Sequence, residues 1–322
     1  MPDDRSAIRL EAIVKEYAGG VRAVDGVALD VPEGAFVVLL GPSGCGKTTL
    51  LKSVNRLLEP TSGRIFIDGE DALAADPVLL RRRIGYVIQQ VGLFGHMTVA
   101  ENVSVVPELL RWPKRDIAAR IDELLALVHL EPSQYRQRYP AQLSGGQQQR
   151  VGLARALAAD PKILLMDEPF GAIDAIERTH LQDEMAALHA RLRKTILFVT
   201  HDVDEALRLA DRIVVMRDGK VEQDAAPLDV MTHPSTRFVS DLLDTGDVVR
   251  RFGVMKVAAA MSAADGVIDA QAPSIGGEQT MREALSLLLS GTAESLVVRA
   301  GDGAAVGRLS LADIRRAARP AA

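Results

Sequence analysis

The chain lacks several features that would settle its compartment or its fold class at once. Its 322 residues include one cysteine, Cys45, so no disulfide forms within the chain and a reducing compartment is favoured. No apolar run approaches the ~20 residues that span a bilayer. The first residues, MPDDRSAIRL, lack the basic-then-apolar layout of a secretory signal. We therefore expect a cytosolic protein that acts at a membrane only through partners.

Aromatic rings are few and the net charge is small. Aromatic residues make up 4% of the chain and Trp112 is the single tryptophan, which argues against an aromatic cage for a quaternary amine within it. The formal net charge of -5 gives no reason to expect a nucleic acid as partner. Hydrophobic residues at 48% are ordinary for a globular protein, and the length suggests two domains.

The first third of the chain predicts strands around a nucleotide-binding core. Residues 8–17 and 24–31 alternate apolar and polar positions, as half-buried strands do. The apolar run 35–40 ends in a glycine-rich loop, and a helix is predicted over 47–58. This strand–loop–helix order is typical of an α/β fold with a RecA-like core.

Later segments extend the same core. Buried strands are expected at 163–166 and 195–199, with a helix over 175–192 between them. Between residues 90 and 152 the apolar residues recur with helical periodicity, and further along this holds over 147–158 as well as over 115–128. We therefore predict a helical subdomain inserted in the α/β core.

The segment GPSGCGKT (residues 41–48) matches the phosphate-binding loop pattern in full. Its glycines let backbone N–H groups turn toward phosphate oxygens, and the following helix adds its positive end. Lys47 is expected to reach the β- and γ-phosphates of ATP, and the Thr48 hydroxyl to bind Mg²⁺. The predicted nucleotide-binding residues of this segment are Gly41, Pro42, Ser43, Gly44, Cys45, Gly46, Lys47, Thr48 and Thr49.

An apolar strand, ILLMDE (residues 163–168), ends in two carboxylates. Asp167 is in position to hold a metal ion, and Glu168 to polarise an attacking water as a general base. Taken alone, this pattern fits an ordinary strand end with solvated acids equally well. After a phosphate-binding loop, the catalytic interpretation is favoured.

The segment LSGGQQQR (residues 143–150) narrows the class. It opens a predicted helix, so Ser144 and the N–H groups that follow form an anion site. Here the chain resembles the ATP-binding cassette (ABC) ATPases, whose signature is LSGGQ. In that family the signature completes the ATP site of the opposite subunit. The resemblance therefore implies a head-to-tail homodimer in which Ser144, Gly145, Gly146 and Gln147 contact the partner's nucleotide.

The resemblance implies roles for four further residues. Gln89 matches the glutamine that senses Mg²⁺ and the γ-phosphate, and His201 matches the switch histidine at the γ-phosphate. Asp174 lies where the family has the aspartate of its D-loop, although GAID replaces the commoner SALD. Tyr17 matches the aromatic residue that stacks on adenine; for Tyr17 a purely structural place in a strand is the alternative.

Within the family, residues 8–240 resemble the ATPase subunits of importers for osmoprotectants such as glycine betaine, carnitine, choline or proline. This resemblance implies separate membrane permease subunits, an extracytoplasmic solute-binding protein and a location at the cytoplasmic face of the cell membrane. Residues 91–97 are expected to receive a short helix of the permease. The alternative for Leu93, Phe94 and Met97 is simple core packing.

The predicted domains are an ABC ATPase domain at 1–240, a linker at 241–254 and a small module at 255–322. The last of these resembles one CBS module of the cystathionine-β-synthase type, in a single copy where the family often has two. Leu285, Leu287, Leu288 and Leu289, with Leu309 and Ile314, form an apolar stripe that ~70 residues alone would bury poorly.

Other ABC proteins remain as alternatives. Exporters usually fuse membrane helices to the ATPase, DNA-repair members carry a coiled coil or zinc cysteines, and translation factors hold two ATPase copies; none of these is in the sequence. The sequence does not name the solute, and an importer of another small solute such as an amino acid, or a non-transport ATPase, stays open.

Overall fold

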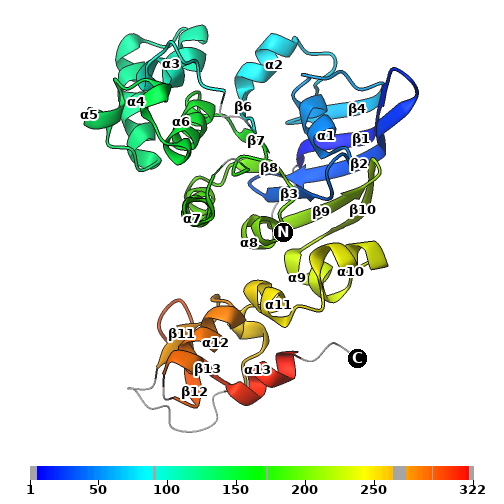
Figure 1. Cartoon of the computed structure of the whole chain (residues 1–322), viewed down its shortest axis with the longest axis vertical. Helices are drawn as coiled ribbons and strands as arrows, with labels where there is room; N and C mark the ends of the chain where they lie inside the picture. Colours follow the sequence, from blue (N-terminus) through cyan, green and yellow to red (C-terminus); the bar gives the residue numbers. More distant parts are fainter. Residues whose placement is uncertain (1–5, 90–91, 172, 264–272, 292, 319–322) are drawn as a thin grey trace. The chain divides into compact units, whose positions relative to one another are not determined.

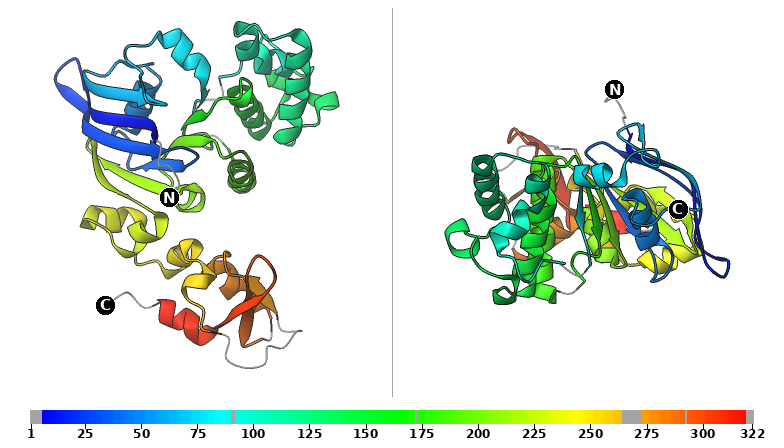
Figure 2. Two further views of the ribbon diagram at one scale, coloured as in Figure 1. Left: turned by 180° about the vertical axis from the view of Figure 1, so that it is seen from behind. Right: turned by 90° about the horizontal axis from the view of Figure 1, so that it is seen from above.

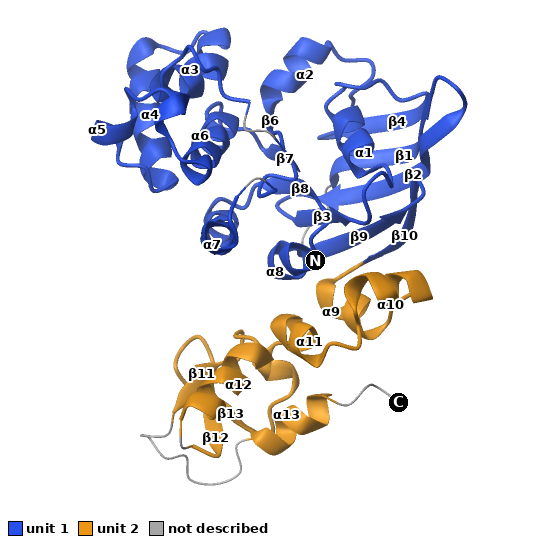
Figure 3. Ribbon diagram, viewed as in Figure 1, with its two compact units in different colours: residues 1–224 blue, residues 225–322 orange. Residues whose placement is uncertain are grey.

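The computed structural model describes residues 6–89, 92–171, 173–263, 273–291 and 293–318. Figure 1 labels its helices and strands, and Figure 2 gives two further views. The chain divides into two compact units, residues 1–224 and 225–322, coloured separately in Figure 3. Within the described ranges, no helix combines the length and apolar character that crossing a bilayer requires.

A six-stranded sheet forms the centre of the first unit, in the order β10-β9-β3-β8-β7-β6. Strand β3 pairs in parallel with β8 and β9, and β7 pairs in parallel with β6 and β8. Every residue of β3 is buried, as its continuous apolar sequence FVVLL predicts for a strand covered on both faces. The strands are β3 Phe36–Leu40, β6 Ile84–Val87, β7 Ile163–Asp167, β8 Thr195–Thr200, β9 Arg212–Arg217 and β10 Lys220–Ala225.

A second, antiparallel sheet has the order β2-β1-β4-β5. Its strands β1 and β2 show the alternation of buried and exposed residues that the sequence predicts. The strands are β1 Ser6–Tyr17, β2 Val21–Pro32, β4 Ser62–Ile67 and β5 Glu70–Asp71. Because their apolar faces need a partner layer, these strands pack on the core described next.

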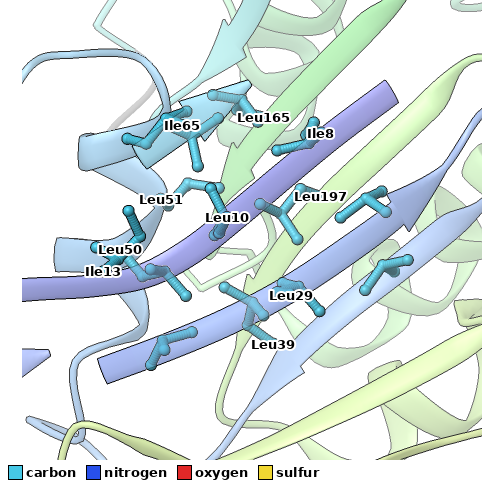
Figure 4. Packing of buried hydrophobic residues seen from close by; sticks show 14 of the residues in the cluster. Ile8, Leu10, Ile13, Leu29, Leu39, Leu50, Leu51, Ile65, Leu165 and Leu197 are labelled. Atoms are coloured by element: carbon cyan, nitrogen blue, oxygen red, sulfur yellow. The ribbon is translucent and has the colours of Figure 1, made fainter. Parts of the chain in front are cut away.

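Leucine and isoleucine side chains from both sheets and from helix α1 (Lys47–Val54) meet in one core. Figure 4 shows Leu10 and Ile13 of β1 beside Leu50 and Leu51 of the helix, with Ile8 farther along the same strand. This packing fixes the helix behind the glycine-rich loop. The helix is shorter than predicted, since it ends at Val54 instead of residue 58.

The predicted helical subdomain contains four α-helices, which cluster apart from the antiparallel sheet in Figure 1. The helix α3 begins at a capping box between Thr98 and Glu101, and α6 begins at another between Ser144 and Gln147. The helices of the first unit beyond α1 are α2 Pro77–Arg83, α3 Val99–Leu109, α4 Lys114–Leu127, α5 Pro132–Tyr135, α6 Gly145–Leu157, α7 Ala175–Leu192 and α8 Val203–Leu209, with a 3-10 turn at Pro140–Gln142.

The second unit has a three-stranded sheet in the order β11-β12-β13. Strands β11 and β12 are parallel, and β12 and β13 are antiparallel across the Gly-Asp-Gly turn at 301–303. Its elements are α9 Pro227–Thr232, α10 Arg237–Leu243, α11 Val248–Val254, a 3-10 turn at Val257–Ala259, β11 Ser274–Gly276, α12 Met281–Ser290, β12 Ser295–Arg299, β13 Ala305–Ser310 and α13 Leu311–Ala318.

The boundary between the units differs from the predicted domain limits. The first compact unit ends at Asp224, whereas the sequence prediction ended the first domain at residue 240. The predicted linker 241–254 contains α11, and Phe252 of that helix is buried in the core of the second unit. The linker interpretation missed this because a seven-residue helix has too few positions to show periodicity. From α12 to α13 the described residues run in the order helix, strand, turn, strand, helix, and the CBS-like module stays a prediction.

Candidate active site

The glycine-rich loop lies between β3 and α1 and takes a backbone path that only glycine allows at key points. Gly44 and Gly46 have φ of 82° and 104°, in the left-handed region that side chains disfavour. A Cβ at Gly46 would lie 2.1 Å from the carbonyl oxygen of Ala23 on β2. The loop is therefore fixed in shape by contact with the antiparallel sheet as well as by its own turns.

Lys47 is buried at the start of α1, with 4% of its surface exposed. Its Nζ donates hydrogen bonds to the carbonyl oxygens of Gly41, at 2.7 Å, and Pro42, at 2.9 Å. It also lies 3.7 Å from the Sγ of Cys45, which is itself buried. A buried ammonium whose partners are neutral carbonyls keeps its full positive charge available to an anion at the loop.

Thr48 and Asp167 bring two oxygen donors together from separate elements. The Thr48 hydroxyl donates to Asp167 Oδ1 at 2.7 Å, which joins the first turn of α1 to the end of β7. Burial raises the pKa of the Asp167 carboxyl, and the Thr48 hydrogen bond opposes that rise. Hydroxyl and carboxylate oxygens are the ligand types that Mg²⁺ prefers, so this pair fits such an ion.

Two predicted catalytic side chains, Gln89 and His201, converge on the third, Glu168. Its Oε2 accepts a hydrogen bond from Gln89 Nε2 at 3.0 Å, and its Oε1 lies 3.2 Å from His201 Nδ1. The residues follow β6, β7 and β8, which are neighbours in the parallel sheet, so their side chains meet at one edge. Glu168 has a φ of 44°, a strained backbone conformation for a residue other than glycine.

The signature segment lines a different pocket. Ser144 accepts from the Gln147 N–H as the N-cap of α6, and Gln147 Nε2 donates to the Tyr135 hydroxyl at 3.1 Å. A pocket of about 460 Å³ opens here. Its lining includes Ser144, Gly145, Gly146, Gln147, Ile173, Asp174 and Glu177. The D-loop aspartate thus lies beside the signature segment, as the N-cap of α7.

The predicted site residues therefore form two groups and one outlier. The phosphate loop, Asp167, Glu168, Gln89 and His201 form the first group, and the signature segment with Asp174 forms the second. Tyr17 lies at the end of β1 opposite Val21, and is 42% exposed. Sequence reasoning gave no role to Tyr135, because no pattern links it to a glutamine 12 positions later.

Comparison with known proteins decides the family. The model of the family described as "ABC transporter" matches residues 24–171. The choline transport ATP-binding protein OpuBA of Bacillus subtilis is 47% identical over 291 residues, which cover 90% of this chain and 75% of that protein. The chain belongs to the ABC transporter ATP-binding proteins.

Further comparisons extend this assignment. The glycine betaine uptake system ATP-binding protein YehX of Escherichia coli is 46% identical over 302 residues, covering 94% of this chain and 97% of that protein. A dimeric ATP-binding cassette solved in a post-hydrolysis state with ADP and phosphate is 35% identical. It matches 68% of this chain and 98% of its own, with a TM-score of 0.62. The expected α/β P-loop fold and ABC-type ATPase activity are thereby confirmed.

Proposed function

We propose that this ABC ATPase drives the import of a quaternary amine osmoprotectant through separate membrane subunits. The observation that carries the catalytic part is the convergence of Gln89 and His201 on the Glu168 carboxylate. A carboxylate fixed by two flanking side chains is suited to take a proton from a water molecule that attacks the γ-phosphate. In the neighbouring glycine-rich loop, the Lys47 ammonium supplies positive charge to the phosphates.

Each residue of the first group has a defined task. Lys47 exchanges its carbonyl partners for the β- and γ-phosphate oxygens, and Thr49 lies near the α-phosphate. Mg²⁺, held by Thr48, Asp167 and Gln89, would neutralise charge on the β- and γ-phosphates. Glu168 acts as general base, and His201, which lies beside that carboxylate, contacts the γ-phosphate. Tyr17 stacks on the adenine base.

The second group acts on the nucleotide of another copy. Ser144 and the N–H groups that open α6 point into the 460 Å³ pocket, an arrangement suited to bind phosphate oxygens at a helix N-terminus. Because this pocket is separate from the phosphate loop, we propose a head-to-tail homodimer in which each ATP lies between one phosphate loop and the partner's signature segment. Asp174 contacts the opposite subunit beside it.

A groove beside the helical subdomain is the proposed contact for the permease. Its volume is about 360 Å³, and it is lined by Tyr86, Phe94, Val105 and Val106 among others. Phe94 is 42% exposed, which core packing would not leave, and Arg155 lies over its ring at 5.8 Å. A short permease helix would cover these apolar side chains. Of the predicted contact segment 91–97, Val91 lies outside the described residues.

The proposed class of solute rests on how much of this chain is similar to each class of relative. Matches to choline, carnitine, glycine betaine and osmoprotectant import subunits run over 291 to 316 aligned residues and cover 90% to 96% of this chain. Those to sulfate/thiosulfate import subunits run over 237 to 250 residues and cover 74% to 77%. The longer matches therefore include most of the second unit. This favours an osmoprotectant over another small solute such as an amino acid, and over a non-transport ATPase.

Reconstitution tests the whole proposal. The chain is co-purified with its permease and binding protein, placed in lipid vesicles, and assayed for ATPase activity with added solutes. Glycine betaine, choline or carnitine should stimulate hydrolysis, while sulfate and amino acids other than proline should not. Stimulation by an unrelated solute alone would overturn the substrate class, and failure to bind any permease would overturn the importer assignment. We further propose that the complex holds the chain at the cytoplasmic face of the membrane.

A further inference from the structure

A buried acidic residue of α8 has no place in the ATP chemistry described above. Glu205 is 5% exposed. Its Oε2 accepts a hydrogen bond from the Thr200 hydroxyl at 2.6 Å, and its Oε1 accepts one from Gln182 Nε2 at 3.2 Å. These partners lie at the end of β8 and on α7. The carboxylate therefore joins three elements of the first unit at one point.

The Thr200 hydroxyl links Glu205 to the backbone that directly follows His201. It donates to Glu205 and accepts a hydrogen bond from the Asp202 N–H at 2.9 Å. Asp202 in turn caps α8 by accepting from the N–H groups of Asp204 and Glu205. His201 has a side chain that is 56% exposed, so packing does not fix it. Its position depends on the hydrogen bonds of its neighbours.

A second contact links the segment around His201 to the face of α7 that carries Gln182. Arg178 lies four positions before Gln182, so the two side chains share a face of the helix. Arg178 NH1 lies 3.9 Å from Asp202 Oδ2, and its NH2 donates to the Ile173 carbonyl oxygen at 2.9 Å. Helix α7 thus contacts the histidine loop (residues 200–205) at two points, Asp202 and Glu205.

We propose that Glu205 is a positioning residue that holds Thr200, and with it His201, in the place where the imidazole meets Glu168. The inference rests on the proposed role of His201. Glu205 is too deeply buried, and bound to too many protein groups, to act on the nucleotide itself. Its effect on hydrolysis passes through the backbone that carries the imidazole.

The charge of Glu205 matters to this contact. Burial raises its pKa, the Asp202 carboxylate adds to the rise, and the Thr200 hydrogen bond and Arg178 oppose it. Both partners donate, and an ionised carboxylate offers an acceptor oxygen to each of them. Protonation turns one oxygen into a donor and weakens the contact on that side. Acid should therefore loosen the histidine loop at a higher pH than an exposed glutamate would allow.

Protonation of Glu205 affects stability in the opposite direction: it loosens the histidine loop but favours the folded state. A carboxyl whose pKa is higher in the folded state stabilises the fold at low pH, and loses that contribution as the pH rises through the folded pKa. At neutral pH the buried, ionised carboxylate lowers the free energy of unfolding. Glu205→Gln removes that charge while keeping the volume of the side chain. The variant should be as stable as the parent, or more stable, yet slower.

The test compares full-length Glu205→Gln, Thr200→Val and His189→Gln with the parent. His189 lies on the same α7, is buried and hydrogen-bonds the Gly34 carbonyl oxygen at 3.1 Å, so it controls for a lost polar contact away from the histidine loop. We expect kcat to fall ~10-fold or more in the first two, with the KM for ATP within ~2-fold, because small misplacements of a catalytic group cost up to ~100-fold. His189→Gln should keep kcat despite a lower Tm.

Three outcomes would overturn the inference. They are a normal kcat in Glu205→Gln, a kcat loss that follows the Tm loss across all three variants, and an acid limb of the pH–rate profile that Glu205→Gln leaves unchanged. His201→Ala is measured in parallel. If His201→Ala is inactive while Glu205→Gln is normal, only the positioning role fails. If His201→Ala is fully active, the proposed catalytic site itself fails.

Discussion

The two units of the chain use buried polar groups in different ways. In residues 1–224, the buried Asp167 accepts a hydrogen bond from Thr48 on α1, and the buried Glu205 accepts hydrogen bonds from Thr200 on β8 and Gln182 on α7. In residues 225–322, the buried Asp313 accepts from Ser310 and Ser262, contacts that close a helix start and a strand edge. The first set of contacts lies at the carboxyl ends of β7 and β8, where the proposed catalytic side chains also lie, whereas the second set holds the start of α13 and indicates a stable helix cap. The comparison predicts that variants in the first unit stop catalysis and that changes in the second only modulate it.

The largest expected effect is at the convergent carboxylate. Glu168→Gln keeps the size of the side chain but removes the base, so ATP hydrolysis should fall ~10²–10⁴-fold while ATP still binds. Steady-state ATPase rates and nucleotide binding measure this. The control is Glu70→Gln, an exposed carboxylate that pairs with Arg83 on the surface. Near-normal turnover in Glu168→Gln would contradict the assignment of the general base.

The second effect tests whether the two groups of site residues meet only between copies. Ser144→Arg and Lys47→Ala homodimers should both be nearly inactive, because each lacks one half of every ATP site. A mixed dimer with one change in each subunit collects both defects in one site and leaves the other intact. ATPase activity of purified mixed dimers measures the recovery. No recovery above either homodimer would remove support for the shared site.

A matched variant separates docking from helix capping. Ser144 is the N-cap of α6, and losing such a cap costs ~1 kcal/mol of stability. Ser144→Asp keeps a capping oxygen but adds a negative charge where the phosphate is proposed to bind. It should keep the Tm of the parent and lose ATP-dependent dimerisation. A variant that dimerises normally with ATP would show that the pocket does not receive a phosphate.

The sequence alone indicates the motif residues, because each motif is a continuous segment with a fixed local geometry. Parallel strands then bring Gln89, Glu168 and His201 to one edge, which the family resemblance implied and the strand order explains. Glu205 was not found, since a buried acid on a short helix has no local pattern. Helix α11 was missed for a similar reason, because Phe252 is set by packing in the second unit.

A smaller effect is expected at the single thiol. Cys45 is 4% exposed and lies 3.7 Å from the Lys47 ammonium, so a bulky maleimide should react slowly and then inactivate the ATPase by blocking the phosphate loop. MgATP should slow the reaction further. The rate is followed by mass spectrometry, with Cys45→Ala as the control that stays active in the reagent. Equal labelling rates with and without MgATP would contradict this.

The smallest effect is expected in the second unit, where we propose that the module at 255–322, predicted from its resemblance to a CBS module, pairs with a second copy. The predicted leucine stripe divides in the structure. Leu288, Leu309 and Ile314 are buried in the core, whereas Leu287 is 45% exposed and Leu289 is 71% exposed on α12. The two exposed leucines are the part of the stripe that this unit leaves uncovered. They offer an apolar contact to another copy.

Leu289→Lys tests that contact without disturbing the core. Because the side chain is exposed, the variant should change the free energy of unfolding by ~0.5 kcal/mol or less. It should weaken self-association of the full-length chain without nucleotide, measured by analytical ultracentrifugation. Leu288→Lys is the contrasting variant, since that buried position should lose stability. Unchanged self-association in Leu289→Lys would mean that this face is not the contact.

Removal of the module then decides whether pairing regulates hydrolysis. A cut at residue 240 would fall inside α10, whose Leu243 is buried, so the chain should end at Thr245 in the turn that follows. The shortened protein keeps every residue of both site groups and should hydrolyse ATP at close to the parental rate. What should change is the response of transport-coupled ATPase activity to ionic strength, because a pairing module can bias the dimer that forms the ATP sites. If the shortened chain and Leu289→Lys both follow the parental salt profile, the module is a structural appendage with no sensing role. If the shortened chain instead loses hydrolysis altogether, the division of labour between the two units is wrong, because the second unit would then be part of the catalytic assembly.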